Sequence, residues 1–221
     1  MDKILNIALD GPSGSGKSTV AKAISKKLNI LYLDTGAMYR ATGLKANKLG
    51  IDTFDEEGVK TFINDIDLQI KYIDGTQHTF LDGEDVSEKI REPQVSMWAS
   101  NISSLKCVRI KMVDMQRQIA GQMSCVLDGR DIGSYVLPDA KFKFYITAST
   151  AVRTERRFKE LKAKGFDVDF DNLYKEIEQR DYNDSHREFS PLKKADDALV
   201  LDTSDMTVDE VLEKVLSYIG E

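Results

Sequence analysis

A run near the start of the chain, Gly11 to Thr19, has the composition of a loop that binds a polyphosphate. It reads Gly-Pro-Ser-Gly-Ser-Gly-Lys-Ser-Thr and matches G-x-x-x-x-G-K-[ST] at every fixed position. Glycines let the backbone curl until its N–H groups point at phosphate oxygens. Lys17 can reach the β- and γ-phosphates, and the hydroxyl of Ser18 can bind Mg²⁺. The residues predicted to hold the donor phosphates are Gly11, Pro12, Ser13, Gly14, Ser15, Gly16, Lys17, Ser18 and Thr19.

Arginines follow two of the predicted strands, at the sheet edge where the phosphate loop also lies. Arg40 comes shortly after the second strand and Arg130 directly after the third. The guanidinium fork pairs with phosphate oxygens through two hydrogen bonds, so this coincidence predicts a second phosphate site. Further candidates are Arg153 and Arg157, one helical turn apart, and Arg180 and Arg187, which flank Asp184.

These residue types suit the transfer of a phosphoryl group between two phosphates. Charge builds up on the equatorial oxygens of the transferring group, and Mg²⁺, lysine and arginine must offset it. An acceptor that is itself a phosphate is already ionised near neutral pH, so no general base is required. Neither His78 nor His186 is placed to act as one.

The elements that must position these residues alternate between strand and helix. Helical patterns separate the apolar runs, and the last helix opens with capping-box spacing at Thr207 and Glu210. Near-continuous apolar runs indicate strands buried on both faces, which predicts a three-layer α/β fold with a parallel sheet. Ligands of such sheets bind beyond the carboxyl ends of the strands, where Asp34, Asp128 and Thr147 also fall. The predicted strands are 4–9, 31–33, 124–127, 142–146 and 198–201.

One region departs from this alternation. Residues 68–72 alternate apolar and polar, and Asp74-Gly75 and Asp82-Gly83 each offer a turn. This pattern predicts a hairpin or a small three-stranded antiparallel unit. A helix bearing Val95, Trp98, Ala99 and Ile102 follows, so residues 62–100 are predicted to be an inserted subdomain.

Composition limits the classes of function. A hydrophobic content of 41%, a charged content of 31% and a net charge of −6 fit a globular protein and argue against nucleic acid or an anionic membrane as the main partner. No apolar stretch could span a bilayer, and Met1-Asp2-Lys3 lacks the pattern of a signal peptide, so a cytoplasmic location is expected. Cys107 and Cys125 are expected to be reduced thiols, with Cys125 in a buried strand.

Together the motifs resemble those of bacterial cytidylate kinases along essentially the whole chain. They are the loop GPSGSGKST, the segment LDTGAMYR, the insert, the run DGRDIG at 128–133 and the run RDYNDSHREFSPL at 180–192. The resemblance implies a P-loop core with a five-stranded parallel sheet (residues 1–61 and 101–221), an inserted subdomain that binds the nucleoside monophosphate (62–100), and a short lid near 153–187. It also implies Mg²⁺-dependent transfer of the γ-phosphoryl group of ATP to CMP or dCMP, by an enzyme expected to be a monomer.

The resemblance also implies roles for individual residues. Arg40, Arg130 and Arg187 would hold the CMP phosphate, while Arg180 and Asp184 would contact its ribose. Asp131 would accept from the exocyclic amine of cytosine, where uracil presents a carbonyl. The lid arginines Arg153 and Arg157 would approach ATP, and Asp128 would either order Mg²⁺ through water or fix the neighbouring loop. The implied catalytic residues are Lys17, Arg40, Arg130, Arg157 and Arg187, and the implied CMP ligands are Thr35, Arg40, Ser100, Arg109, Asp128, Arg130, Asp131, Arg180, Asp184 and Arg187.

Three alternatives compete with this interpretation. The acceptor could be UMP, AMP or shikimate, although an adenylate kinase lacks the insert and the DGRD run, and shikimate needs no residues that read a base. A GTPase switch would carry an N-K-x-D run, and Asn47-Lys48-Leu49-Gly50 lacks the aspartate. A non-catalytic nucleotide-binding regulator is disfavoured by the intact Lys17-Ser18 pair and the arginines.

Overall fold

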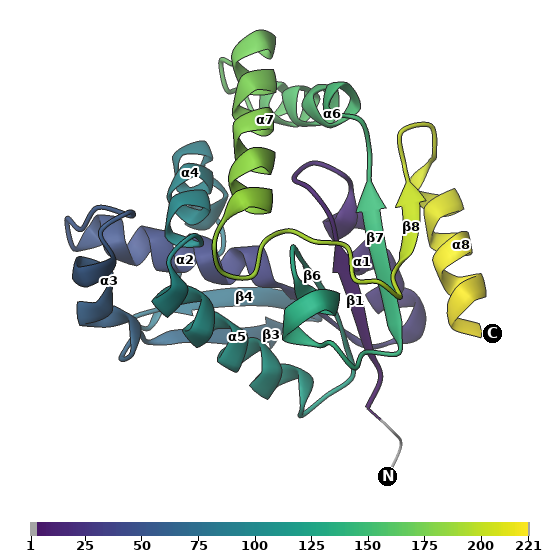
Figure 1. Cartoon of the computed structure of the whole chain (residues 1–221), viewed down its shortest axis with the longest axis horizontal. Helices are drawn as coiled ribbons and strands as arrows, with labels where there is room; N and C mark the ends of the chain where they lie inside the picture. The colour runs from purple at the N-terminus through teal and green to yellow at the C-terminus, as the bar shows by residue number, and fades with distance from the viewer. Residues whose placement is uncertain (1–3, 221) are drawn as a thin grey trace. The chain divides into compact units, whose positions relative to one another are not determined.

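A parallel sheet carries the phosphate loop. Its strand order is β2-β6-β1-β7-β8, and β1 pairs in parallel with β7, as β7 does with β8 (Figure 1). All five predicted strands are confirmed, with ends that differ by one or two residues. Both faces of the central strands are buried, which explains their apolar sequences. The strands are β1 (Asn6–Asp10), β2 (Leu31–Asp34), β6 (Cys125–Gly129), β7 (Phe142–Thr147) and β8 (Leu199–Asp202).

The computed structural model describes residues 4–220. Met1-Asp2-Lys3, on which the expectation about a signal peptide rests, lie outside the described residues. By contact density the chain forms two units, of which the first holds residues 4–5 and 31–125 and the second holds residues 6–30 and 126–220. Within residues 4–220, no helix combines the length and apolar character that crossing a bilayer requires.

In the second unit, helices α1 (Lys17–Leu28) and α8 (Val208–Gly220) pack against each other. Tyr218 of α8 lies edge-on to Phe144 of β7, at 5.6 Å between ring centroids, so α8 covers part of the sheet. The capping box predicted for this helix is confirmed, because Thr207 N–H donates to Glu210 Oε2 and Glu210 N–H donates to Thr207 Oγ1.

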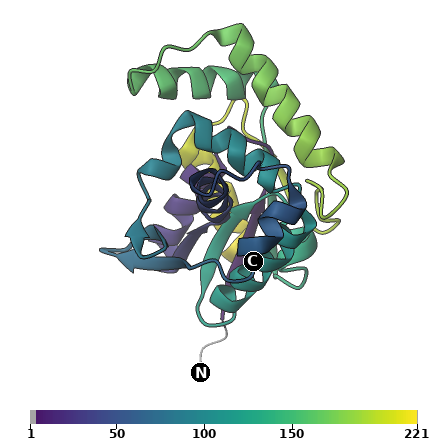
Figure 2. The same ribbon diagram turned by 90° about the vertical axis from the view of Figure 1, so that its left-hand side faces the viewer.

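Two further helices of the second unit, α6 (Thr150–Ala163) and α7 (Phe170–His186), form a pair with a small core of its own (Figures 1 and 2). Leu161, Leu173 and Ile177 are buried in it, and the rings of Phe158 and Phe170 meet edge-on. Both helices begin at a side-chain cap, Ser149 for α6 and Asp169 for α7. This pair occupies most of the range predicted to be the lid.

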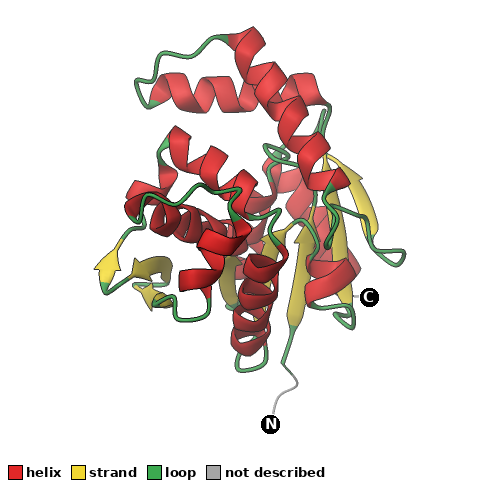
Figure 3. Ribbon diagram, turned by 60° about the vertical axis from the view of Figure 1, so that its left-hand side comes forward, coloured by secondary structure: helices red, strands yellow, loops and turns green. Residues whose placement is uncertain are grey.

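The first unit contains the predicted three-stranded antiparallel sheet, which is confirmed. Its strands β3 (Leu68–Ile73), β4 (Thr76–Leu81) and β5 (Glu84–Asp85) form a separate three-stranded sheet, and both predicted turns place an aspartate and a glycine at positive φ (Figure 3). Helix α4 (Pro93–Ile102) packs along α2 (Thr35–Lys48), and three residues of the predicted helix, Val95, Ala99 and Ile102, are buried on α4. The remaining elements of this unit are α2 (Thr35–Lys48), α3 (Glu56–Ile63), the short 3₁₀ turn η1 (Lys89–Arg91), α4 (Pro93–Ile102) and α5 (Lys106–Ala120).

Cys125 is fully buried in β6, as predicted, and burial raises the pKa of its thiol to about 12. Both cysteines are free thiols. Asn47 and Lys48 fall in the last turn of α2, so the Asn47–Gly50 run is the end of a helix.

Candidate active site

The phosphate loop bends between β1 and α1, in the strand–loop–helix context that its motif requires. Gly16 has a φ of 90° and caps α1, and its carbonyl accepts from the N–H groups of Thr19 and Val20. Helix α1 therefore begins at Lys17, which places the positive end of its dipole at the loop.

Lys17 is buried, and its ammonium group turns back onto the loop. Its Nζ donates to the carbonyl oxygen of Pro12 at 2.6 Å and to Ser15 Oγ at 3.3 Å. Burial, together with the nearby Arg130, lowers the pKa of Lys17 to about 7, against the opposing effect of Asp128 and Asp10. A bound polyphosphate would add negative charge beside this amine and raise its pKa again.

Ser18, the next residue of α1, donates through Oγ to Asp128 Oδ2 at 2.6 Å. Asp128 lies near the end of β6, which is how the sheet brings the two residues together. A hydroxyl and a carboxylate oxygen side by side are the ligands that Mg²⁺ takes from a protein when phosphates and waters complete its shell. The residues present therefore fit the predicted metal. Among residues 4–220, no cluster of three or more His, Cys, Asp or Glu side chains could hold a metal without such help.

Three of the predicted acceptor residues meet around a buried carboxylate in the second unit. Arg130 Nε donates to Asp184 Oδ2 at 2.8 Å, and Arg187 Nη1 lies 3.8 Å from Asp184 Oδ1. Burial raises the pKa of Asp184, but Arg130, Arg180 and Arg187 outweigh it and hold that pKa below its usual value. Asp184, which the sequence analysis assigned to the ribose, is thus an ionised anchor that orients guanidinium groups, a role that the sequence pattern did not reveal.

Asp131 is also buried and lies beside the segment after α7. Its Oδ2 accepts from Ser190 Oγ at 2.5 Å, and its Oδ1 is 3.8 Å from Arg187 Nη2. Ser190 has a φ of 50°, a conformation rare for residues other than glycine. The structure therefore connects DGRD to RDYNDSHREFSPL, two motifs that the sequence gives only as separate runs.

Asp10 is a charged residue near the site that the sequence prediction missed. It is the last residue of β1, and its carboxylate accepts from the backbone N–H groups of Ile132 and Gly133, each at 2.7 Å. Its position directly before Gly11 is the only signal in the sequence that could have drawn attention to it.

The arginines of α6 divide into different roles. Arg153 is buried, and it donates to the carbonyl of Ser13 in the phosphate loop at 3.0 Å and pairs with Asp181 of α7 at 2.6 Å. Arg157 is partly exposed and pairs with Glu160 of its own helix. The unpredicted Arg156 donates to Thr203 Oγ1 at 3.1 Å and to the Thr203 carbonyl at 2.6 Å.

Thr203 completes this side of the loop, because its Oγ1 also donates to the carbonyl of Ser15. The segment after β8 and helix α6 are therefore both bonded to the phosphate loop. Spacing along α6 could not select Arg156 over its neighbours, since the selection depends on which side chain reaches the end of β8.

In the first unit, Asp34 organises the predicted arginine Arg40. The Asp34 carboxylate caps α2 by accepting from Ala37 N–H, and its Oδ2 accepts from both Arg40 Nη2 and Arg91 Nη2 at 2.8 Å. Burial raises the pKa of Asp34, but these two guanidinium groups and the Ala37 N–H lower it to about 2. Arg91 is a second arginine at this carboxylate, and the prediction did not include it.

Gly36 is needed where it stands because Arg40 folds back over it. A Cβ at Gly36 would lie 3.1 Å from Arg40 Nη1 and 3.1 Å from Asp34 Oδ1. Arg40 Nε is buried, and within residues 4–220 no acceptor bonds to it. A guanidinium with an unsatisfied buried donor is suited to receive an additional anion.

The other acceptor residues predicted in the first unit lie on three helices. Thr35 is buried at the start of α2, and Ser100 is half-buried on α4. Arg109 of α5 is only 1% exposed, with its guanidinium 5.4 Å from the centre of the Tyr39 ring. A buried arginine beside an aromatic face is a planar cation held in a fixed orientation.

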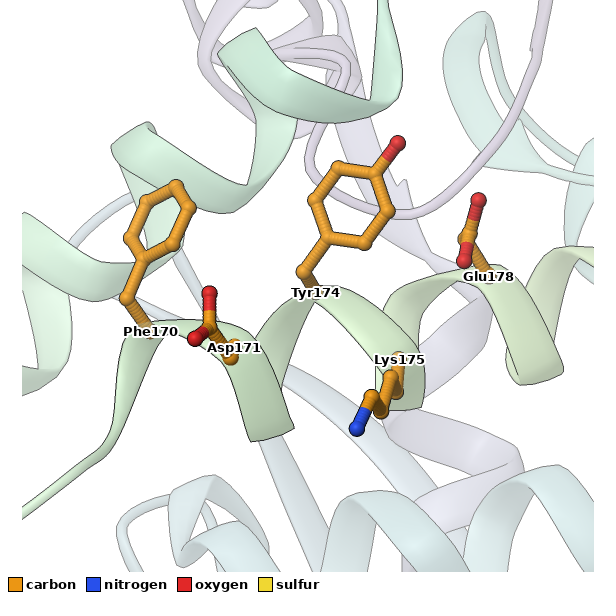
Figure 4. Close-up of a pocket in the computed structure, with 5 residues that line it drawn as sticks. All are labelled: Phe170, Asp171, Tyr174, Lys175 and Glu178. Atoms are coloured by element: carbon orange, nitrogen blue, oxygen red, sulfur yellow. The ribbon is translucent and has the colours of Figure 1, made fainter.

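The hollow in Figure 4 does not coincide with these residues. It has a volume of about 470 Å³ and is lined by residues of α7 alone, with Phe170, Tyr174 and Glu178 on one face of that helix. None of the predicted donor or acceptor residues lines it. The candidate site is therefore defined, within each unit, by side chains joined through hydrogen bonds and ion pairs rather than by this hollow.

Comparison with known proteins places these motifs in one family. A family model described as cytidylate kinase matches residues 7–221. A protein named cytidylate kinase from Caldicellulosiruptor bescii is 51% identical over 214 residues, which cover 97% of this chain and 95% of that protein. Another of that name from Lactobacillus johnsonii is 46% identical over 219 residues, covering 99% of this chain and 95% of its own.

A solved structure of an uncharacterised protein from Eubacterium ventriosum is similar in fold. It has a TM-score of 0.54 at 15% identity and covers 98% of this chain and 99% of its own.

Proposed function

This chain belongs to the cytidylate kinase family and phosphorylates CMP or dCMP with ATP, and from that premise we propose which residues carry out the transfer. The phosphate loop binds the donor triphosphate through its backbone N–H groups and Lys17. The observation that carries this assignment is the contact between Ser18 Oγ and Asp128 Oδ2. It supplies two oxygen ligands for a metal next to the loop onto which the Lys17 ammonium group folds.

Ser18 and Asp128 would hold Mg²⁺, either directly or through water. When bound, the metal ion would neutralise charge on the donor phosphates. Lys17 offsets the charge that develops on the transferring group. A phosphate acceptor needs no proton removed near neutral pH, so the protein need only orient the two substrates and exclude water.

We propose that the acceptor phosphate is bound by arginines whose remaining contacts keep them in place. Arg40 is tied to Asp34 through Nη2 and keeps a buried, unsatisfied Nε. Arg130 is tied to Asp184 through Nε, and its Nη1 donates to the carbonyl of Gly129 at 3.3 Å. A guanidinium held at one edge by a carboxylate is oriented before the phosphate arrives, which lowers the entropy lost on binding.

The base and ribose of the acceptor are assigned to the remaining predicted residues. Asp131 accepts from the cytosine amine, in exchange for or in addition to its bond from Ser190. Arg180 and Asp184 serve the ribose, and Thr35, Ser100 and Arg109 complete the acceptor site. On the donor side, Arg153 and Arg157 approach ATP.

The predicted division of the chain is retained as part of this proposal. Residues 62–100 form the insert that binds the acceptor, and the pair of helices α6 and α7, near 153–187, acts as the lid. The small core between α6 and α7 supports the second assignment, since it lets the pair behave as one body. A cytoplasmic location and a monomeric state also remain predictions, and the net charge of −6 supports the absence of nucleic-acid and membrane partners.

A coupled assay with ATP, Mg²⁺ and one monophosphate at a time tests the proposed acceptor. We expect CMP and dCMP to be turned over with far higher kcat/KM than UMP or AMP. Lys17→Ala serves as the inactive control. A preference for UMP or AMP would contradict the assignment of the acceptor. If none of the monophosphates supported turnover, the enzyme would catalyse a different reaction.

A further inference from the structure

A buried carboxylate at the end of β1 holds the segment that carries two of the proposed acceptor residues. Asp10 is 4% exposed, and each of its oxygens accepts one backbone N–H at 2.7 Å, Oδ1 from Ile132 and Oδ2 from Gly133. Ile132 and Gly133 are the first two residues of a short π-helical turn (Ile132–Val136). The first N–H groups of a helical turn have no partner within it, so Asp10 caps this turn from a different strand.

A second charged residue holds the same segment from the neighbouring strand. In the parallel pairing of β1 with β7, Lys143 lies opposite Ala8. Asp10 is two residues after Ala8, and side chains two residues apart in a strand lie on the same face. Asp10 and Lys143 therefore lie on one face of the sheet. Lys143 Nζ donates to the carbonyl of Pro138 and to Asp197. Its side chain passes so close to Gly133 that a Cβ there would lie 3.1 Å from Lys143 Cδ.

The two contacts fix the segment at both ends. Asp10 holds its start at Ile132 and Gly133, and Lys143 holds its end at Pro138. Arg130 and Asp131 directly precede the first of these anchored positions, so their backbone has little freedom to shift.

Keeping the Asp10 carboxylate ionised costs free energy that packing alone does not require. Burial raises its pKa to about 7, the carboxylate of Asp131 acts in the same direction, and the two backbone N–H groups and Lys17 oppose them. A neutral side chain would avoid this desolvation. A bidentate carboxylate is the group that aligns two consecutive N–H donors most rigidly.

We propose that Asp10 is a positioning residue for the acceptor: by holding the backbone of Ile132 and Gly133, it fixes Arg130 and Asp131 and so sets acceptor affinity and base selectivity. The inference rests on the proposed function, in which Arg130 and Asp131 bind the acceptor nucleotide. Because Asp10 also directly precedes Gly11, one residue links the loop for the donor to the segment for the acceptor.

Asp10→Asn tests the proposal, since it keeps the shape of the side chain but replaces one accepting oxygen with an amide that cannot accept. We expect the KM for CMP to rise about tenfold and the ratio of kcat/KM for CMP over UMP to fall, while the Kd of a non-hydrolysable ATP analogue changes less than twofold. Titration calorimetry measures that Kd, and thermal unfolding gives the stability of the variant.

Asp55→Asn is the matched control. The Asp55 carboxylate also accepts one backbone N–H, from Gly58 at 3.0 Å, where it caps α3. Asp55→Asn should leave the KM for CMP and the CMP/UMP ratio unchanged, with little effect on the Tm, because the remaining amide oxygen can still accept this one bond. Lys143→Met is a second test of the same clamp, to be used if Asp10→Asn does not fold, and it should raise the KM for CMP with the ATP analogue again unaffected.

The outcomes separate the inference from the function on which it rests. Acceptor kinetics of Asp10→Asn within twofold of the parent, or an equal loss of acceptor and ATP-analogue affinity, would overturn the positioning role. Arg130→Lys and Asp131→Asn are measured alongside. If neither changes acceptor kinetics, the assignment of the acceptor residues is itself wrong, whatever Asp10→Asn does.

Discussion

Ser18 Oγ lies 2.6 Å from Asp128 Oδ2, although the two residues are 110 positions apart in the sequence. Ser18 is the second residue of the helix that follows one strand, and Asp128 lies near the end of another strand. The contact gives the phosphate loop a carboxylate that its own motif lacks.

Removing the Ser18 hydroxyl should weaken the use of the metal. We expect Ser18→Ala to lower kcat about tenfold or more and to raise the Mg²⁺ concentration for half-maximal rate, because one oxygen ligand is lost. Ser25→Ala is the control on the same helix, where the hydroxyl donates to the Ile30 carbonyl. An unchanged Mg²⁺ dependence in Ser18→Ala would exclude Ser18 as a ligand.

Lys17 should act mainly on the chemical step. Lys17→Ala is expected to lower kcat by about 10²–10³-fold, since the ammonium offsets charge that develops only during transfer. Single-turnover kinetics with saturating ATP and CMP measures this directly. Lys26→Ala, in the last turn of α1, is the control. Turnover of Lys17→Ala near that of the parent would remove the lysine from the mechanism.

Arg40 should bind the acceptor phosphate. Arg40→Lys keeps the charge but loses the forked donor, so the KM for CMP should rise about tenfold with little change in the KM for ATP. Gly36→Ala should act in the same direction, because the new methyl group would displace the Arg40 guanidinium. Steady-state kinetics in both substrates measures the effect.

Arg91→Lys provides the comparison for Arg40, since Arg91 donates to the same oxygen of Asp34. The side chain of Arg91 is 48% exposed, against 15% for Arg40, so we expect the smaller effect from Arg91→Lys. Equal effects of the two variants would show that the charge around Asp34 matters rather than the position of Arg40.

Asp34 should make the stability of the protein depend on pH under acidic conditions. Its pKa is about 2 in the folded protein and 3.8 as the ordinary value, so its ionised form stabilises the fold by about 2 kcal/mol above pH 4. That contribution is lost as the pH falls from about 4 towards 2. Urea unfolding of Asp34→Asn and the parent should therefore differ most at neutral pH and converge on acidification. A constant difference at every pH would refute the role of the charge.

Much of the fold follows from the sequence because local patterns encode it. Buried parallel strands read as apolar runs, and the two Asp-Gly turns set the small antiparallel sheet. Strand ends do not follow from hydrophobicity alone: β1 begins at Asn6 rather than at Ile4, whose apolar side chain is exposed.

The candidate site was predicted where a motif carries it and missed where no motif does. Arg156 has the same local signal as Arg153 and Arg157, and only the position of Thr203 at the end of β8 distinguishes it. Asp184 belongs to a predicted motif, yet its role as the carboxylate that holds Arg130 depends on where α7 ends.

The sequence by itself determined which chemistry this chain carries, because the phosphate loop, its lysine and its serine are consecutive residues whose geometry is local. The tertiary structure decided which carboxylate each of these groups meets. Asp128 beside Ser18, and Asp10 beneath Ile132 and Gly133, are pairings across more than a hundred residues that the order and register of the sheet produce. Helical and strand periodicity describes one segment at a time, so it contains no information about which strand ends become neighbours.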